Sequence, residues 1–288
     1  MKYLLLIGVV LVLYAGHAQS DSFPNRRKWL VGGATTVLTA GSLSVLASVW
    51  YADYPKSSFH SFDDSREWLQ MDKLGHAYTA NVLSQAQYQA WKWAGASENS
   101  AIWRAGAVSW GYLLGVEILD GFNQEWGFSF SDLAANTAGT GMFMLQQAKW
   151  GEQRVQLKFG YRASSFAALR PKTLGSNWSE RLLKDYNAQS YWIAAAPTRF
   201  MQTDKLRWLQ LAIGYSAHEK LFGNEDHVFW NDQYYTAKRE WAIGLDVDWS
   251  QIPIRKPWLR KSIAVLNAVK IPLPSIFWRN GVCYLGVL

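Results

Sequence analysis

The sequence is poor in cysteine, in charged residues and in the short motifs that mark common enzyme classes. Cys283 is the only cysteine, so no internal disulfide can form, and a chain of 288 residues does not need one to hold its core. There is no Gly-rich phosphate loop, no Gly-x-Ser-x-Gly elbow and no zinc-finger spacing. These absences argue against a disulfide-stapled secreted scaffold, nucleotide hydrolysis and elbow-type serine esterase chemistry.

Aromatic residues, by contrast, are abundant. The chain holds 17 Trp, 14 Tyr and 13 Phe, and 49% of its residues are hydrophobic, which excludes a disordered or collagen-like protein. The mean hydropathy of -0.13 argues against a polytopic inner-membrane protein. The composition therefore predicts an ordered chain with much buried aromatic surface, and it leaves membrane association open.

The first residues have the pattern of a secretory signal peptide. Lys2 precedes an apolar run over 3–14, and Gly16-His17-Ala18 forms a small-residue approach to a cleavage point before Gln19. The alternative is an uncleaved anchor helix, but the run is shorter than the roughly 20 residues that span a bilayer. No cysteine follows the run, so we expect no lipoprotein anchor. We expect residues 1–18 to be removed and the mature chain to lie in the bacterial envelope, on the periplasmic face of a membrane, the outer membrane rather than the inner.

Basic residues outnumber acidic ones, with a net charge of +7. An exported protein does not meet nucleic acid, so we expect neither a nucleic acid nor a nucleotide partner. Several basic residues stand beside aromatic ones, in the segments 26–29, 199–200, 207–208 and 256–258. This interleaving fits contact with anionic lipid headgroups, although ordinary surface charge explains it equally well.

The first half of the mature chain is predicted to be helical. An uncharged stretch over 30–51 is rich in small residues; it is either one transmembrane helix or, as we favour, a buried or membrane-docked helix. The basic residues before it oppose a simple inner-membrane span, because cleavage would leave them on the periplasmic side. Further helices are expected at 65–94, 101–119 and 131–149, the last capped by the serines and aspartate of 129–132. Residues 19–150 thus predict a bundle of about four helices, partly membrane-associated.

After residue 150 the apolar period changes from helical to two. Alternation over 155–161, 209–215 and 240–249 predicts half-buried strands, with one or two helices near 179–187 and 258–269. The fold class is therefore α+β, with an antiparallel β region over 151–288; an outer-membrane barrel, which needs at least about 8 strands, is the second interpretation. The alternation places Asp246 and Asp248 on the solvent side of their strand, and Cys283 is expected to be buried.

Three pairs of polar residues interrupt otherwise apolar helical stretches. Each pair is spaced three or four residues apart and so shares one helix face: Asp72 and His76, Glu117 and Asp120, Asp132 and Asn136. A buried carboxylate is costly unless it is paired, hydrogen-bonded or metal-bound. Three interpretations remain open. The first is a structural network, with Asn136 and neutralisation by Lys73 or His76. The second is a divalent metal site, and the third a metal-free acid and base pair. The candidate ligands and catalytic groups are His76, Asp72, Glu117, Asp120 and Asp132.

The blocks that carry these residues, 68–76, 115–121 and 127–139, resemble the YfiM-like envelope proteins, a family of unknown function described as periplasmic lipoproteins. More distantly, the order Asp-Lys-x-x-His, Glu and Asp-x-x-x-Asn is similar to that of VanZ-like membrane proteins. The resemblance covers 65–145 and implies an envelope location without an established reaction. The missing lipobox cysteine is a departure from the lipoprotein pattern.

These observations predict an exported, membrane-associated envelope protein that binds or organises an envelope lipid or a partner protein. Two alternatives remain. One is a hydrolase, dependent on a metal or on acid and base groups, that acts on a lipid or lipid-linked substrate. The other is a structural subunit of an outer-membrane complex.

Overall fold

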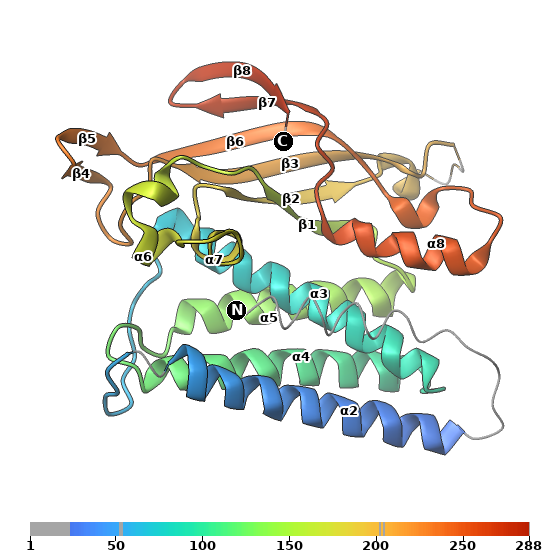
Figure 1. Ribbon diagram of the computed structural model, residues 1–288. Helices are drawn as coiled ribbons and strands as arrows, with labels where there is room; N and C mark the ends of the chain where they lie inside the picture. Colours follow the sequence, from blue (N-terminus) through green and yellow to red (C-terminus); the bar gives the residue numbers. More distant parts are fainter. Residues whose placement is uncertain (1–23, 52–53, 202, 204, 288) are drawn as a thin grey trace. The chain divides into compact units, whose positions relative to one another are not determined.

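The computed structural model describes residues 24–51, 54–201, 203 and 205–287, and it confirms the α+β class (Figure 1). The predicted signal peptide lies outside the described residues. The chain packs into two compact units. Among the described residues, those of 24–65 and Thr79–Glu152 form the helical unit, and those of Arg66–Tyr78 and 153–287 form the sheet unit.

The helical unit is built from four long helices, as the sequence predicts, although the first eight residues of α3 belong to the sheet unit. They are α2 (Pro24–Val45), continued by a π-helical turn at Leu46–Trp50, α3 (Met71–Trp93), α4 (Glu98–Gly121) and α5 (Phe130–Trp150). α4 packs against both α5 and α2. Two apolar clusters hold the unit together, one around Trp91, Ile102 and Phe143 and one around Leu46, Leu83 and Leu113.

α3 begins six residues later than the predicted boundary at Ser65. Trp68, Leu69 and Gln70 all have left-handed backbone conformations, with φ of 51°, 52° and 64°, which an α-helix does not accommodate. Hydrogen bonds fix this turn, since the Trp68 N–H donates to Gly223 O and the Tyr215 hydroxyl donates to Leu69 O. The turn is thus set by residues far along the sequence, which no local pattern reveals.

The sheet unit contains a six-stranded antiparallel sheet in the order β1-β2-β3-β6-β7-β8. Its strands are β1 (Val155–Tyr161), β2 (Gln189–Ala195), β3 (Leu209–His218), β6 (Lys238–Val247), β7 (Pro274–Arg279) and β8 (Val282–Val287). A separate hairpin pairs β4 (His227–Trp230) with β5 (Gln233–Thr236). Short helices connect the strands: α6 (Pro171–Leu174), α7 (Trp178–Lys184) and α8 (Pro257–Ile263).

The sheet curls around one of its faces. Trp192 of β2 and Phe277 of β7 lie on that face with ring centroids 6.5 Å apart, although β3 and β6 separate their strands, which a flat sheet would hold about 14 Å apart. The connection after β6 reaches back to the free edge of β1, where Val269 bridges Phe159 in parallel. We call the enclosed side the inner face and the opposite side the outer face. β1 and β8 are the edge strands, so the described sheet is an open one of six strands rather than a closed barrel.

The two faces have the reverse of the expected polarity. Asp246 and Asp248, predicted to face solvent, are fully buried on the inner side. Asp246 lies 3.1 Å from Lys158 and 3.7 Å from Lys270, and Asp248 lies 2.7 Å from Arg199. The prediction failed because alternation gives the period of a strand but not the face that the rest of the chain covers. The expectation of a buried Cys283 was also wrong, since this residue is exposed near the end of the chain.

Candidate functional site

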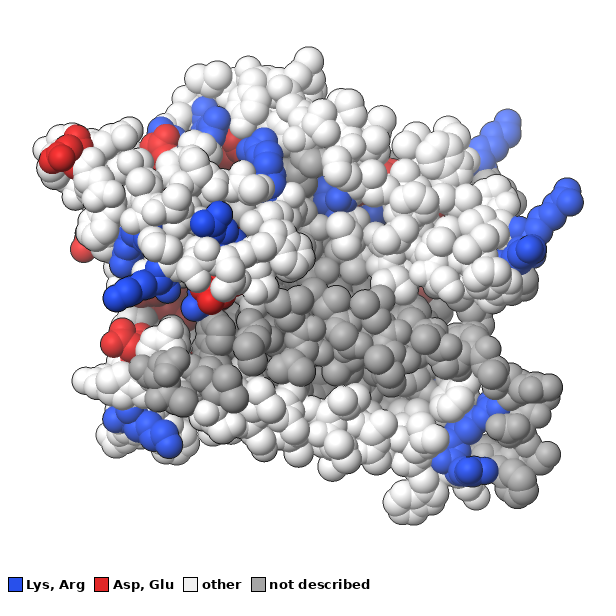
Figure 2. Space-filling view, in the orientation of Figure 1, with Lys and Arg blue, Asp and Glu red and all other residues white. Residues whose placement is uncertain are grey.

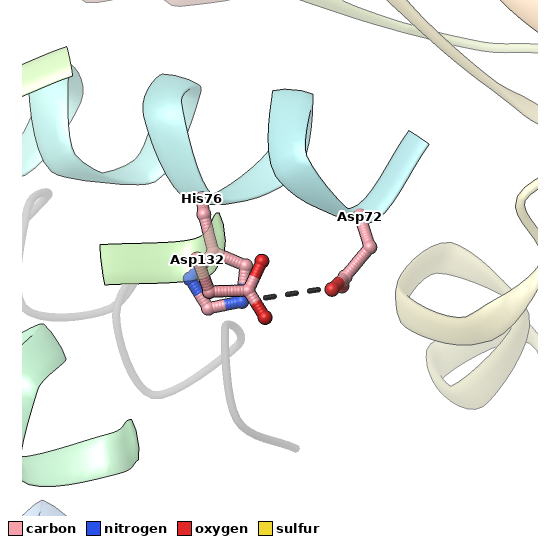
Figure 3. Close-up of side chains that lie close together, drawn as sticks. All are labelled: Asp72, His76 and Asp132. Carbon is pink, nitrogen blue, oxygen red and sulfur yellow. Dashed lines mark ion pairs between the residues drawn. The ribbon is translucent and has the colours of Figure 1, made fainter. Parts of the chain in front are cut away.

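The sheet unit carries the first candidate pair, Asp72 and His76, on the opening turns of α3. Their spacing of four residues places them on the same side of the helix, with His76 Nε2 3.9 Å from Asp72 Oδ1 (Figure 3). His76 is buried and Asp72 is partly exposed. Asp132, drawn in the same figure, belongs to the helical unit and is described there with its own neighbours.

Asp72 is held in its ionised form. Burial alone would raise the pKa of this carboxyl, but the nearby charges of His76 and Lys73, with hydrogen bonds from Tyr186 and Lys73, outweigh burial and lower the pKa from 3.8 to about 2. Lys73 Nζ donates to Oδ2 at 3.1 Å and the Tyr186 hydroxyl donates to Oδ1 at 2.7 Å. The carboxylate is therefore ionised at neutral pH.

Tyr186 is the member of this set that no sequence pattern predicted. It follows Asp72 by 114 positions, just after α7, and its ring packs on Trp68 with centroids 5.1 Å apart. Its segment does carry a local signal, because the Asp185 carboxylate accepts the N–H of Asn187 in the manner of an Asx turn. That signal predicts a turn but gives no partner for it.

The helical unit holds the other buried carboxylates around the start of α5. Ser129 caps this helix, as predicted, by accepting the Asp132 N–H at 3.0 Å. Its own N–H donates to Glu117 Oε2 at 3.4 Å, and its hydroxyl donates to Asp64 Oδ1 at 2.6 Å. Glu117 and Asp132 are both almost fully buried. Ser129 thus links the carboxylates of Glu117 and Asp64 to the start of α5, where it accepts the backbone N–H of Asp132. No sequence pattern predicted Asp64 as a member of this group.

Asp120 and Asn136 have separate surroundings. The Tyr51 hydroxyl donates to the Asp120 carboxylate, so the end of α2 is tied to the end of α4. Asn136 is fully buried one turn into α5 from Asp132. Asp120 lies three residues after Glu117, yet it contacts Tyr51, whereas Glu117 contacts Ser129. Their shared helix face had predicted that the two carboxylates would act together.

Each unit thus brings part of the predicted constellation together. The sheet unit joins Asp72 with His76, Lys73 and Tyr186, and the helical unit joins Glu117 with Asp132 through Ser129. That all these groups act at one centre stays a prediction. Chemically, an ionised carboxylate beside a histidine suits a proton acceptor or a metal ligand, whereas carboxylates that accept backbone N–H groups are typical of structural anchoring.

Comparison with known proteins gives one finding. Residues 60–148, which include every candidate site residue, match the model of a family described as predicted periplasmic lipoprotein (DUF2279). No curated protein and no solved structure gives a significant match. The match covers under a third of the chain and supports an exported protein of the cell envelope.

Proposed function

We propose that the protein associates with the periplasmic face of the outer membrane and binds anionic lipid there. The observation that carries the proposal is the surface of α2. Within Asn25–Ser48, an 18-residue window has a mean hydropathy of 1.6, and only 17% of that window is buried. By length and composition this helix could cross a membrane. Trp29 is 82% exposed and Val37 is 70% exposed. An apolar helix whose side chains are mostly exposed is suited to lipid.

The distribution of charge on the helical unit supports the same function. Between residue 29 and Val45 of α2, between 105 and 116 of α4 and between 133 and 148 of α5 there is no charged residue. The charges lie instead near the helix ends, among them Arg26, Arg27 and Lys28 at the start of α2. Figure 2 shows this pattern over α2: basic side chains lie at the start of the helix, and the rest of its visible surface carries no charged side chain. Basic residues beside Trp29 fit a headgroup layer next to hydrocarbon.

Flotation of the full mature chain with vesicles tests the proposal. We expect the chain to float with vesicles that contain phosphatidylglycerol and to float less with vesicles of phosphatidylcholine alone. Val37→Asp should weaken flotation by about a hundredfold, since an aspartate in the middle of a membrane helix costs about 3 kcal/mol. Ser58→Asp, which adds the same charge at an exposed loop position, is the matched control. A chain that stays at the bottom of the gradient with both vesicles would contradict the proposal.

A second candidate function is hydrolysis of a lipid or lipid-linked substrate. The Asp72–His76 pair favours it, because an ionised carboxylate can orient a histidine that accepts a proton or binds a metal. In the metal-dependent form, Asp72 and His76 are the proposed ligands in the sheet unit. Carboxylate–histidine pairs also occur in many purely structural networks, so this function ranks second.

Metal analysis of the protein, purified without a metal-binding tag, tests the metal-dependent form. We expect about one divalent ion per chain, and we expect His76→Ala to lose it. The control is His227→Ala, which should retain the ion, because His227 lies in the β4–β5 hairpin and forms a hydrogen bond with the Thr236 hydroxyl. A folded chain that binds no metal would leave only the metal-free acid and base form. Retention of hydrolytic activity by His76→Ala would eliminate that form too.

A further inference from the structure

The outer face of the sheet carries a continuous apolar surface. One row crosses all six strands and consists of aliphatic side chains only: Leu157, Ile193, Ile213, Ile243, Ile276 and Leu285. The last five are exposed, from 40% at Ile276 to 79% at Leu285. The next row adds exposed Leu211, Leu245 and Val287. Soluble proteins rarely expose an apolar patch larger than a few hundred Å².

An aromatic row borders these two aliphatic rows. Trp241 pairs with Trp278, and Trp278 pairs with Cys283, and all three are exposed. Toward β1 the same row continues with Tyr215 and Tyr191, which pack against residues 69–78 of the sheet unit. Beyond it stands Arg239, which donates to Gln70. Along β3, the six steps from Leu209 to Tyr215 measure about 20 Å, close to the height of the apolar band of membrane β-proteins, about 25 Å.

The inner face holds the charged residues that are absent from the aliphatic and aromatic rows of the outer face. Besides Asp246 with its two lysines, buried Glu240 lies 3.6 Å from Arg162 and 3.5 Å from Arg279, and it accepts a hydrogen bond from Tyr284. A sheet that contacts water on one side turns its polar residues outward. Here the polar residues point inward and the apolar ones outward, which is the pattern of strands that face lipid.

Basic residues lie next to the end of the sheet where β3 starts and β6 ends. Lys205 and Arg207 come directly before β3, and exposed Arg255, Lys256 and Arg260 follow β6. From residue 249 to 288 the chain has six basic residues and no acidic one. This end also carries exposed Trp208 and Trp258. Cationic and indole side chains beside an apolar face complement the anionic headgroups that border bilayer hydrocarbon.

We propose that the outer face of the sheet contacts the hydrocarbon of an anionic envelope bilayer, with the basic segments around 205–207 and 255–260 at the headgroups. This inference rests on the proposed membrane association and gives the sheet unit its own lipid contact, in addition to that of α2. The inverted polarity and the charge of the flanking segments carry it together. A second copy of the chain on the same face is the competing occupant.

The lone cysteine makes the test direct, because Cys283 lies on the outer face and no other thiol competes for the label. The full chain is labelled there with a nitrobenzoxadiazole fluorophore and mixed with phosphatidylglycerol vesicles. The same measurement is then made on vesicles that carry a nitroxide on the acyl chain. We expect a blue shift of the emission on vesicle binding and strong quenching by the acyl-chain nitroxide. In a Cys283→Ser background, Ile243→Cys should behave in the same way.

The control is Asn231→Cys in the same background, because Asn231 is exposed in the turn between β4 and β5 and should show neither a shift nor quenching. If the chain floats but neither outer-face label is quenched, this inference fails while the proposed membrane association stands. A blue shift without quenching would indicate that a second copy covers the face, and it would also overturn the inference. A chain that does not float at all contradicts both proposals.

Discussion

At the scale of single residues, Asp72 has the clearest electrostatic signature. A pKa lowered from 3.8 to about 2 means that the folded state binds the proton more weakly than the unfolded state, so the stabilisation is present above pH 3.8 and is lost as the pH falls through about 2. We expect Asp72→Asn to lower the free energy of unfolding by about 2 kcal/mol at pH 7, and by progressively less between pH 4 and pH 2. Denaturant titrations across this range measure it, with Asp232→Asn in the exposed β4–β5 turn as the control. An effect of Asp72→Asn that does not depend on pH would contradict the assignment.

Gly75, one residue before His76, is required by a close approach. A Cβ at this position would lie 2.9 Å from the Tyr191 hydroxyl oxygen, whereas a Cβ at Gly111 of α4 meets no atom within 4 Å. Both glycines are inside helices, so alanine should gain about 0.5–1 kcal/mol from helix propensity at each. We expect Gly111→Ala to raise the melting temperature and Gly75→Ala to lower it. Tyr191→Phe, which removes the hydroxyl, should relieve the Gly75→Ala variant. Equal melting temperatures for the two alanine variants would refute the close contact.

At the scale of elements, the strands show what the sequence could and could not predict. β1 was predicted at its observed bounds, and α4 and α5 nearly so, because period and capping are local properties. The face that each strand buries was predicted wrongly for β6, since it depends on Lys158 and Lys270 meeting Asp246 from distant segments. The same reason separates the site residues. Asp72 and His76 share one helix, so their spacing predicted the pair. Tyr186 contacts Asp72, and Asp64 contacts Ser129, only because the tertiary fold brings distant segments together.

The inner face gives an element-scale prediction. Asp246 is the carboxylate between two buried ammonium groups, those of Lys158 and Lys270. Asp246→Asn leaves both without their nearest counter-charge, so we expect it to lower the free energy of unfolding by about 3–5 kcal/mol. Adding Lys270→Gln should recover part of this loss, because one of the two uncompensated charges is then removed. Urea denaturation followed by circular dichroism measures both effects. If Asp246→Asn were as stable as the natural chain, the ion pairs of Asp246 with Lys158 and Lys270 would not stabilise the fold.

At the scale of the whole molecule, the protein exposes two apolar surfaces and carries an excess of positive charge. α2 exposes apolar side chains in the helical unit, and the outer face does so in the sheet unit. The chain carries a net charge of +7, and its last forty residues hold no acidic group. Apolar area alone would fit any hydrophobic partner. The basic excess at its borders is what favours an anionic lipid surface over a neutral one.

This combination predicts that the position of a positive charge matters more than the total charge. Lys256→Gln with Arg260→Gln removes two exposed charges beside the end of the outer face, and Lys172→Gln with Lys184→Gln removes two in α6 and α7. A basic residue near an anionic membrane contributes about 1 kcal/mol, so the first pair should weaken binding to phosphatidylglycerol vesicles by about thirtyfold. The second pair should change it little, and raising the salt concentration should reduce the difference, because screening acts on charges at the headgroup layer. Equal losses for the two pairs would mean that net charge alone attracts the chain, and the outer face would then have no defined orientation toward the membrane.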